Sequence, residues 1–201
     1  MNKRQELAMQ TRENLICEAK KIFAIKDFQD VSVEEITKAC GVAKGTFYTY
    51  FKKKEDIISE IGFLHFEQLQ ERILNENKPI LEKLNDYFIS FMELVEEYGI
   101  HICRQWIINN LNPSSDTVNL INNETKINFD INCIRLIFNQ AVEKKELSLQ
   151  TPIDLLSYLF MSELYGMMII WCMSNKEFEP LEWISQFNQL QLSKILDEYL
   201  L

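Results

Sequence analysis

Residues 31–57 read VSVEEITKACGVAKGTFYTYFKKKEDI, and this stretch decides the fold of the N-terminal part of the chain. Ser32 followed by Glu35 is the pattern of a capping box, in which the hydroxyl accepts from the third helical amide and the carboxylate reaches back to the cap. A short helix is therefore predicted over residues 33–40. Gly41 then supplies the left-handed backbone that lets the chain leave this helix and turn.

A second short helix is predicted to start at Lys44. Phe47 and Phe51 lie one turn apart on the same side of it, and with Val42 they would anchor it to the first helix. Its other side carries donors and rings, namely Lys44, Thr46, Tyr48 and Thr49. Two short helices joined by a glycine turn, the second with a polar free side, indicate a helix-turn-helix that reads DNA. The alternative is an ordinary helical hairpin with core aromatics and solvated lysines.

The first residues of a recognition helix are the ones that reach base edges. Lys44 can donate to guanine, Thr46 can meet a thymine methyl or a base acceptor, and Gly45 lets the backbone come close. Hydroxyl and ammonium groups further along suit phosphate oxygens, which set the register without reading the sequence. The full set of expected DNA-binding residues is Lys44, Gly45, Thr46, Tyr48, Thr49, Tyr50, Lys54 and Ser32.

The net charge changes sign along the chain. Residues 1–54 carry eleven Lys and Arg against seven Asp and Glu, whereas residues 55–201 carry ten against 23. Apolar residues between Thr11 and Phe28 recur at helical intervals, which predicts an amphipathic helix before the helix-turn-helix. A basic N-terminal quarter before an acidic remainder suggests one part that faces nucleic acid and another that faces something else.

Together, these residues resemble the tetracycline-repressor (TetR) family of bacterial transcriptional regulators. The resemblance rests on Gly41-Val42, on the run from Lys44 to Phe51, and on Phe51, Lys54, Glu55 and Ile57. It covers about residues 11–60, and the remainder resembles the family in its helical layout. Ala43 departs from the pattern, because the family often has Ser or Thr there, so the recognition helix lacks a side-chain cap worth about 1 kcal/mol.

The rest of the chain is also predicted to be helical, because 5 Gly and 4 Pro leave few turn signals for a sheet. A long helix would run from Lys54 to Ile73. Further helices are predicted over residues 80–98, 100–111, 124–145, 152–174 and 180–200. The expected fold is all-α with about nine helices. A helix-turn-helix DNA-binding domain at 1–54 is followed by a larger helical domain for effector binding and dimerisation at 55–201.

The predicted helix over residues 152–174 is apolar on nearly all sides, so two of its sides must be covered. We expect one cover to be the rest of the subunit and the other a second copy, with the last helix completing a four-helix interface. The expected interface residues are Leu159, Gly166, Ile170, Trp183, Phe187 and Leu190. The family resemblance implies the same homodimer, which would bind an inverted repeat in double-stranded DNA. A buried core helix of a monomer is the alternative.

The resemblance further implies that the acidic domain holds a small-molecule effector. The 13 Phe, 7 Tyr, 3 Trp and 7 Met allow an apolar or aromatic ligand, and carboxylates with ring faces leave a cation open. Candidate lining residues, each of them also a candidate for plain core, are Phe63, Tyr87, Phe88, Phe91, His101, Trp106, Phe129, Tyr158, Met161, Tyr165 and Met168, with Met92 beside them. Such a ligand would release a repressor from its operator, although activation would use the same parts.

No sequence pattern for catalysis is visible, since a phosphate-binding loop, GxSxG and GxGxxG do not occur. Five scattered cysteines and two histidines show no metal-ligand spacing. We therefore expect no enzyme activity, no cofactor and no metal. The chain start lacks the apolar core of a signal peptide, and residues 164–173 are too short to cross a bilayer, so a cytoplasmic protein without a membrane partner is expected.

Two other classes of function stay open at this point. One is a helical enzyme, or a lipid- or small-molecule-handling protein, without DNA binding. The other is a protein-interaction module that keeps the fold but acts through partners on its acidic surface.

Overall fold

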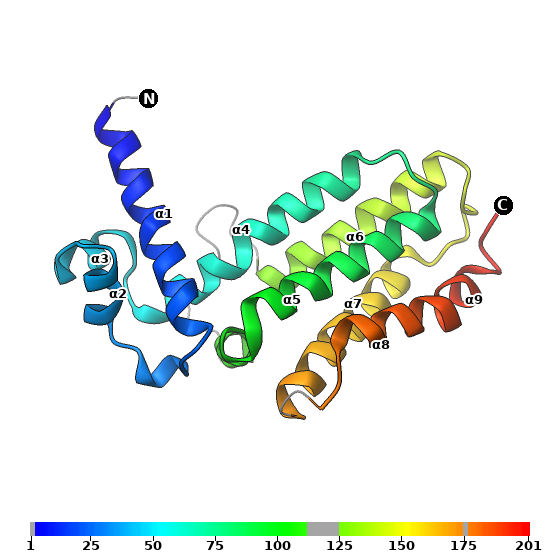
Figure 1. Cartoon of the computed structure of the whole chain (residues 1–201). Coiled ribbons are helices and arrows are strands. Elements are labelled where there is room, and N and C mark those ends of the chain that lie inside the picture. The colour runs from blue at the N-terminus through cyan, green and yellow to red at the C-terminus, as the bar shows by residue number, and fades with distance from the viewer. Residues whose placement is uncertain (1–2, 112–124, 175–176) are drawn as a thin grey trace. The chain divides into compact units, whose positions relative to one another are not determined.

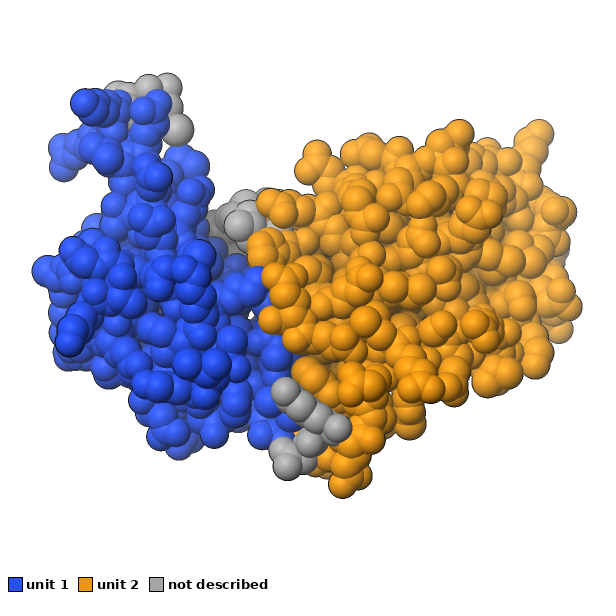
Figure 2. Space-filling view, in the orientation of Figure 1, with its two compact units in different colours: residues 1–64, 98–117 blue, residues 65–97, 118–201 orange. Residues whose placement is uncertain are grey.

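The structure, a computed structural model, describes residues 3–111, 125–174 and 177–201, apart from the side chains of Phe63 and Leu64. In these ranges the chain is helical and forms no β-strand, and an isolated bridge joins Leu147 to Leu200 (Figure 1). The predicted all-α fold is confirmed. The chain divides into two compact units, which are residues 1–64 with 98–117 and residues 65–97 with 118–201 (Figure 2).

The first unit contains the helices that the N-terminal sequence predicts. They are α1 (Lys3–Phe23), a 3-10 turn η1 (Phe28–Asp30), α2 (Val33–Ala39), α3 (Lys44–Tyr50) and the start of α4 (Lys54–Asn75). Helix α1 begins well before the predicted Thr11. Its first turns carry good helix formers on exposed positions, and the apolar periodicity used for the prediction begins only at Leu15, the first buried residue. Periodicity finds the packed part of a helix and misses its solvated extension.

The second unit is built from the rest of α4 and from the helices that follow. They are α5 (Ile80–Leu111, whose end from Tyr98 belongs to the first unit), α6 (Lys126–Glu143), α7 (Ile153–Met173), α8 (Pro180–Phe187), a π-helical turn (Asn188–Leu192) and α9 (Ser193–Leu196). Gly99, with φ 76 and ψ 166, breaks the helical geometry inside α5 where the sequence predicts a break. Glu124, the predicted start of α6, lies outside the described residues.

The single helix predicted over residues 180–200 is wrong in its continuity. The π-helical turn interrupts it at Asn188, whose side-chain amide donates to Asn85 Oδ1 at 2.8 Å. After α9 the chain makes one more turn. Its backbone then bonds to the loop after α6, where Ser148 N donates to Tyr199 O at 2.8 Å. These contacts to distant residues fix the end of the chain, and the local pattern does not contain them.

Helix α7 packs against α6, and the Phe138 and Phe160 rings stack with centroids 5.9 Å apart. Within its 21 residues a window of 18 reaches a mean hydropathy of 1.5, so α7 is long and apolar enough to cross a membrane by length and composition. The expectation that residues 164–173 are too short to cross a bilayer considered only part of this helix, which begins at Ile153. Since 56% of that apolar window is buried inside the protein, α7 has the character of a core helix.

Candidate DNA interface

Helix α2 is capped as the sequence predicts, although only one half of the capping box forms. Glu35 N donates to Ser32 Oγ at 3.1 Å, while the Glu35 carboxylate accepts from Lys26 Nζ at 2.6 Å. The Ser32 hydroxyl is thus used as a helix cap. A DNA contact by Ser32 would have to share this oxygen.

The turn between α2 and α3 is a Schellman motif. Gly41 has φ +67, Gly41 N donates to Lys38 O at 3.1 Å, and Val42 N donates to Thr37 O at 2.9 Å. A Cβ at Gly41 would meet no atom within 4 Å, so the glycine is needed for its backbone conformation and not for space. The turn therefore fixes the direction in which α3 leaves.

Helix α3 has one buried side and one open side. Phe47 is fully buried and its ring lies 5.1 Å from that of Phe51, whereas Tyr48 is 51% exposed. Lys44, Gly45 and Thr49 are also exposed, while Thr46 and Tyr50 are partly buried. The space beside Gly45 is open, since a Cβ there would meet nothing within 4 Å. Ala43 is the N-cap and makes no side-chain cap bond, as the sequence indicates.

The ammonium of Lys44 forms an ion pair with the carboxylate of Glu34 on α2. The hydrogen bond between them raises the pKa of Lys44 and lowers that of Glu34, so both are charged at neutral pH. The sequence analysis did not include Glu34. From the sequence, Glu34 is only a carboxylate in the first turn of α2, where negative charge ordinarily interacts favourably with the helix dipole.

Lys54 is placed differently from the expectation of a free phosphate contact. Its ammonium donates to the carbonyls of Phe28 at 2.5 Å and Val31 at 2.6 Å, and it lies 4.0 Å over the Phe28 ring. Burial lowers the pKa of Lys54. The side chain thus ties η1 to the start of α4, and a phosphate contact would have to break two hydrogen bonds. The neighbouring Lys52, which the expected set omits, is exposed.

A comparison with known families decides what this arrangement is. Residues 15–61 match the family model described as bacterial regulatory proteins, tetR family. Residues 15–61 therefore resemble the DNA-binding domain of the TetR family. The matched range covers α1 from Leu15, the helix-turn-helix and the start of α4, which are the elements just described.

Curated TetR-like relatives align with the first part of the chain. The uncharacterised HTH-type transcriptional regulator YuxN of Bacillus subtilis (strain 168) is 41% identical over 68 residues, or 33% of this chain and 23% of YuxN. The HTH-type transcriptional repressor DhaR of Mycobacterium sp. (strain GP1) is 28% identical over 111 residues, or 53% of this chain and 55% of DhaR. The alignments thus span between about a quarter and about half the length of these relatives.

Solved structures resemble nearly the whole chain. A Clostridium perfringens chain described as a candidate regulator of fatty acid metabolism superposes with a TM-score of 0.66 at 25% identity, covering 94% of this chain and 99% of that one. The transcriptional regulator FadR of Bacillus subtilis, in complex with stearoyl-CoA, gives a TM-score of 0.65 at 22% identity and covers 90% and 98%. These likenesses show that the shared fold extends beyond the TetR DNA-binding domain.

The expected effector residues are divided between the two units. Tyr87, Phe88, Phe91, Met92, Met161 and Met168 are buried in the second unit, with Phe129 and Tyr165 partly exposed there. His101 and Trp106 belong to the first unit, where His101 Nδ1 lies 2.5 Å from Asp27 Oδ1. The Phe63 side chain lies outside the described residues.

Tyr158 departs from the expected interior position, since its side chain is exposed. It lines an open groove with Asn128, Ile131, Asn132 and Arg135 of α6. The expectation rested on residue type, since Tyr158 supplies an aromatic ring on a helix expected to face the cavity. However, the part of α6 that lines this groove is mostly polar, with Asn128, Asn132 and Arg135 beside Ile131, so it covers little of this ring.

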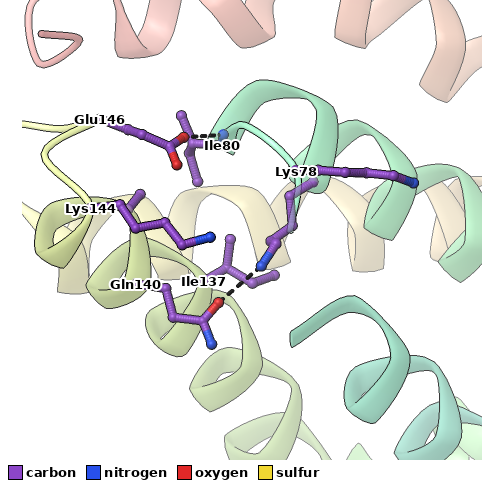
Figure 3. A pocket seen from close by; sticks show the side chains of 8 residues that line it. Lys78, Ile80, Ile137, Gln140, Lys144 and Glu146 are labelled. Carbon is purple, nitrogen blue, oxygen red and sulfur yellow. Dashed lines mark hydrogen bonds between the residues drawn. The ribbon is translucent and has the colours of Figure 1, made fainter. Parts of the chain in front are cut away.

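A hollow elsewhere in the second unit is lined by the start of α5 and the end of α6 (Figure 3). In it Lys83 Nζ donates to Gln140 Oε1 at 2.9 Å, and Ile80 N donates to Glu146 Oε2 at 2.5 Å. Its enclosed space holds about one water molecule. None of the expected effector residues lines it, and its charged side chains already have hydrogen-bond partners in or beside it.

The expected dimer residues form an exposed apolar face on α7, α8 and the turn after them. Leu159, Ile170, Trp183 and Leu190 are each between 45% and 57% exposed. Gly166 lies between the first two on the same helix, and a Cβ there would meet nothing within 4 Å. Phe187 is partly buried, with its ring 6.5 Å from Phe88. This apolar face, which includes Leu155 and Met173 at the ends of α7, is exposed in the part of the chain that the structure describes.

Proposed function

We propose that this protein is a ligand-responsive, DNA-binding transcriptional regulator of the TetR type, a cytoplasmic repressor that binds an inverted repeat as a homodimer. The observation that carries the proposal is α3 itself. Phe47 holds the helix on its support while Lys44, Gly45, Tyr48 and Thr49 lie on the open side. A helix with these groups fits the major groove, where its first residues reach base edges.

The exposed apolar face of α7 and α8 supports the homodimer. Exposing a row of large apolar side chains around an open glycine to water is unfavourable. The same row on a second subunit would cover these side chains. Two copies would bring two α3 helices to one duplex. The inverted repeat follows from this two-fold symmetry.

An apolar effector is supported by the interior of the second unit. The Phe66, Tyr87 and Phe88 rings lie within reach of Phe91 and Phe160, and the thioethers of Met161 and Met168 are buried in the same unit. A FadR structure that contains stearoyl-CoA has this fold, and the relative DhaR is named as a repressor. Both support a repressor that responds to a ligand with a long apolar part.

The mechanism that we propose is a shift between two dimer shapes. Helix α4 is the covalent path, because its first half belongs to the first unit and its second half to the second. The second half of α4 would have two positions. A ligand that binds the protein more tightly when α4 is in one of them would change the spacing between the two α3 helices of the dimer. Ligand and operator would then weaken each other's binding by the same factor.

The test is selection of bound fragments from random DNA by the purified protein at two salt concentrations. The proposal predicts an enriched inverted repeat, with affinity that falls as salt rises. Lys44→Ala and Tyr48→Ala should each weaken binding to the selected repeat while folding and dimerisation are kept. Lys194→Ala, an exposed lysine on α9, is the matched control and should leave affinity unchanged. Enrichment without symmetry would contradict the dimeric reading of DNA.

A further inference from the structure

A buried carboxylate lies inside the second unit, on α6. Asp130 is 0% exposed, and it accepts from the Lys126 ammonium on both oxygens, from the Tyr165 hydroxyl at 2.5 Å and from the Gln70 amide at 3.4 Å. A carboxylate so far from water keeps its charge only beside a positive partner. Lys126 is that partner.

The ammonium of Lys126 is also surrounded by ring faces. It lies 4.0 Å from the centroid of Phe66 and 5.7 Å from that of Phe129. The wall continues from Phe66 to Phe91 at 4.8 Å and from Phe91 to Tyr165 at 5.9 Å. Ring faces carry negative partial charge, so rings with a carboxylate form a cage that selects a cation. In the structure the cage is occupied by the protein's own lysine.

Lys126 is a replaceable occupant. It is the first residue of α6, where the helix dipole disfavours positive charge, and it precedes Asp130 by four residues, which is the weaker order for an ion pair on a helix. Desolvation lowers its pKa. Its side chain is 9% exposed while the residue as a whole is partly exposed, so the flexible stem starts near the surface and can turn to solvent.

We propose that this cage, formed by Phe66, Phe129 and Asp130, binds the positively charged head of the effector, an organic ammonium with an apolar tail that displaces Lys126. The inference rests on the proposed function, since it names the chemical class of the effector. An anionic head is disfavoured, because it would have to approach the Asp130 carboxylate and the negative ring faces.

The surroundings of the cage suit the rest of such a ligand. The Tyr87 hydroxyl is fully buried and has no hydrogen-bond partner in the described part of the chain beyond a weak interaction with the Cys133 thiol. The Tyr87 ring centroid lies 6.3 Å from that of Phe91, which belongs to the wall of the cage, so the hydroxyl is placed to serve a polar group behind the head. The rings of Tyr87 and Phe91 can contact the apolar tail.

The cage also contacts the helix that belongs to both units. Phe66 and Gln70 lie on α4, and the Gln70 amide donates to Phe129 O at 3.2 Å as well as to Asp130. Exchanging one ammonium for another therefore changes contacts on α4 directly. The effector can therefore bind the protein more tightly in one position of α4 than in another.

The first experiment removes the built-in cation. Lys126→Ala leaves Asp130 without its partner, and n-propylammonium supplies the atoms that were removed. Saturating n-propylammonium chloride should raise the melting temperature of this variant by about 4 °C. Sodium chloride at equal ionic strength and the neutral isostere 1-propanol should not do so.

Lys83→Ala is the matched control, because the Lys83 side chain is also buried, but its ammonium bonds to the neutral Gln140 amide and not to a carboxylate. It should gain nothing from n-propylammonium. The double variant Lys126→Ala/Asp130→Asn should also lose the rescue. Equal rescue by 1-propanol, or none by n-propylammonium, would overturn the cage.

The second experiment uses the unmodified protein bound to its selected DNA, and it decides alone where Lys126→Ala does not fold. Hexylammonium chloride should weaken DNA binding about tenfold or more, which is a coupling within the usual allosteric range. Ammonium chloride at equal concentration is the control for the general weakening of DNA binding by salt. Release by hexanoate or 1-hexanol and not by hexylammonium would overturn the inference and leave the regulator function standing. A protein that binds no DNA would overturn the proposed function, while the n-propylammonium experiment still judges the cage.

Discussion

At the scale of single residues, the open side of α3 carries less free positive charge than its sequence suggests. Lys44 is paired with Glu34, and the Lys54 ammonium is bonded to two carbonyls. A DNA base or phosphate must compete with these partners. In the proposed complex this competition would lower the affinity for DNA.

Replacing Glu34 by Gln should strengthen DNA binding. The substitution frees the Lys44 ammonium and removes a carboxylate that is charged at neutral pH, since its pKa is lowered. We expect the dissociation constant to fall about two- to fivefold at low salt, the range for an exposed ion pair. The gain should shrink at high salt, where exposed charges are screened. Fluorescence anisotropy on the selected repeat measures it, and weaker binding would show that Glu34 itself contacts DNA.

The five thiols should differ sharply in reactivity. Burial raises the pKa of Cys133 far above its ordinary value, and Cys103 and Cys172 are buried too, whereas Cys17 is exposed. Because the thiolate is the reactive form, a disulfide reagent should label Cys17 first in the native protein. Cys17→Ser should remove the fast phase of labelling. Fast labelling of Cys133 would contradict the packing of α6.

At the scale of elements, α2 and α3 have unequal ends. Ser32 caps α2 through its hydroxyl, whereas Ala43 at the same place before α3 makes no such bond. The backbone at Ala43, with φ −73 and ψ 151, already has the extended conformation of an N-cap. Helix α3 is therefore held by Phe47 and by the turn more than by its own cap.

Ala43→Ser should stabilise the N-terminal part of the protein by about 1 kcal/mol, because the hydroxyl can accept from an amide in the first turn of α3. Chemical denaturation monitored by circular dichroism measures the change. Ala43→Gly is the control and should bring no such gain. Ser32→Ala should act in the opposite direction by about 1 kcal/mol, as it removes an existing cap. A stability unchanged by Ala43→Ser would show that the cap geometry does not form.

At the scale of the whole molecule, the net charge of −9 opposes binding to DNA. Binding must come from local groups near α3, and a dimer would double both the number of these groups and the opposing charge. This explains why the apolar face of α7 and α8 matters for a function at the other end of the chain. Without a second copy, one short helix alone would have to hold the duplex.

Leu159→Glu should break the dimer, since it places a charge in the middle of the apolar face. Analytical ultracentrifugation should then show a folded monomer, and affinity for the full repeat should drop by about a hundredfold or more, because the second half-site no longer adds to the first. Leu149→Glu is the matched control: this leucine is 93% exposed in the loop before α7 and should change neither property. A dimer that survives Leu159→Glu would place the interface elsewhere.

The amino-acid sequence alone predicts the features that depend on contacts within a few helical turns. The cap at Ser32, the left-handed Gly41, the break at Gly99 and the division of α3 into a Phe47 side and an open side all follow from short spacings, because helical periodicity and backbone conformation are local. The family pattern lies in the same short segment.

The tertiary structure was needed to show which charged side chains are bonded to other groups and which aromatic rings pack together. Lys54 meets carbonyls 23 and 26 residues away, Gln70 meets Asp130 across 60 residues, and Tyr158 points at a polar stretch of α6. Spacing along one helix cannot tell which neighbouring helix will cover a face, or with which atoms. The Lys126 cage exists because two elements far apart in sequence bring rings to an ammonium and a carboxylate that lie one turn apart.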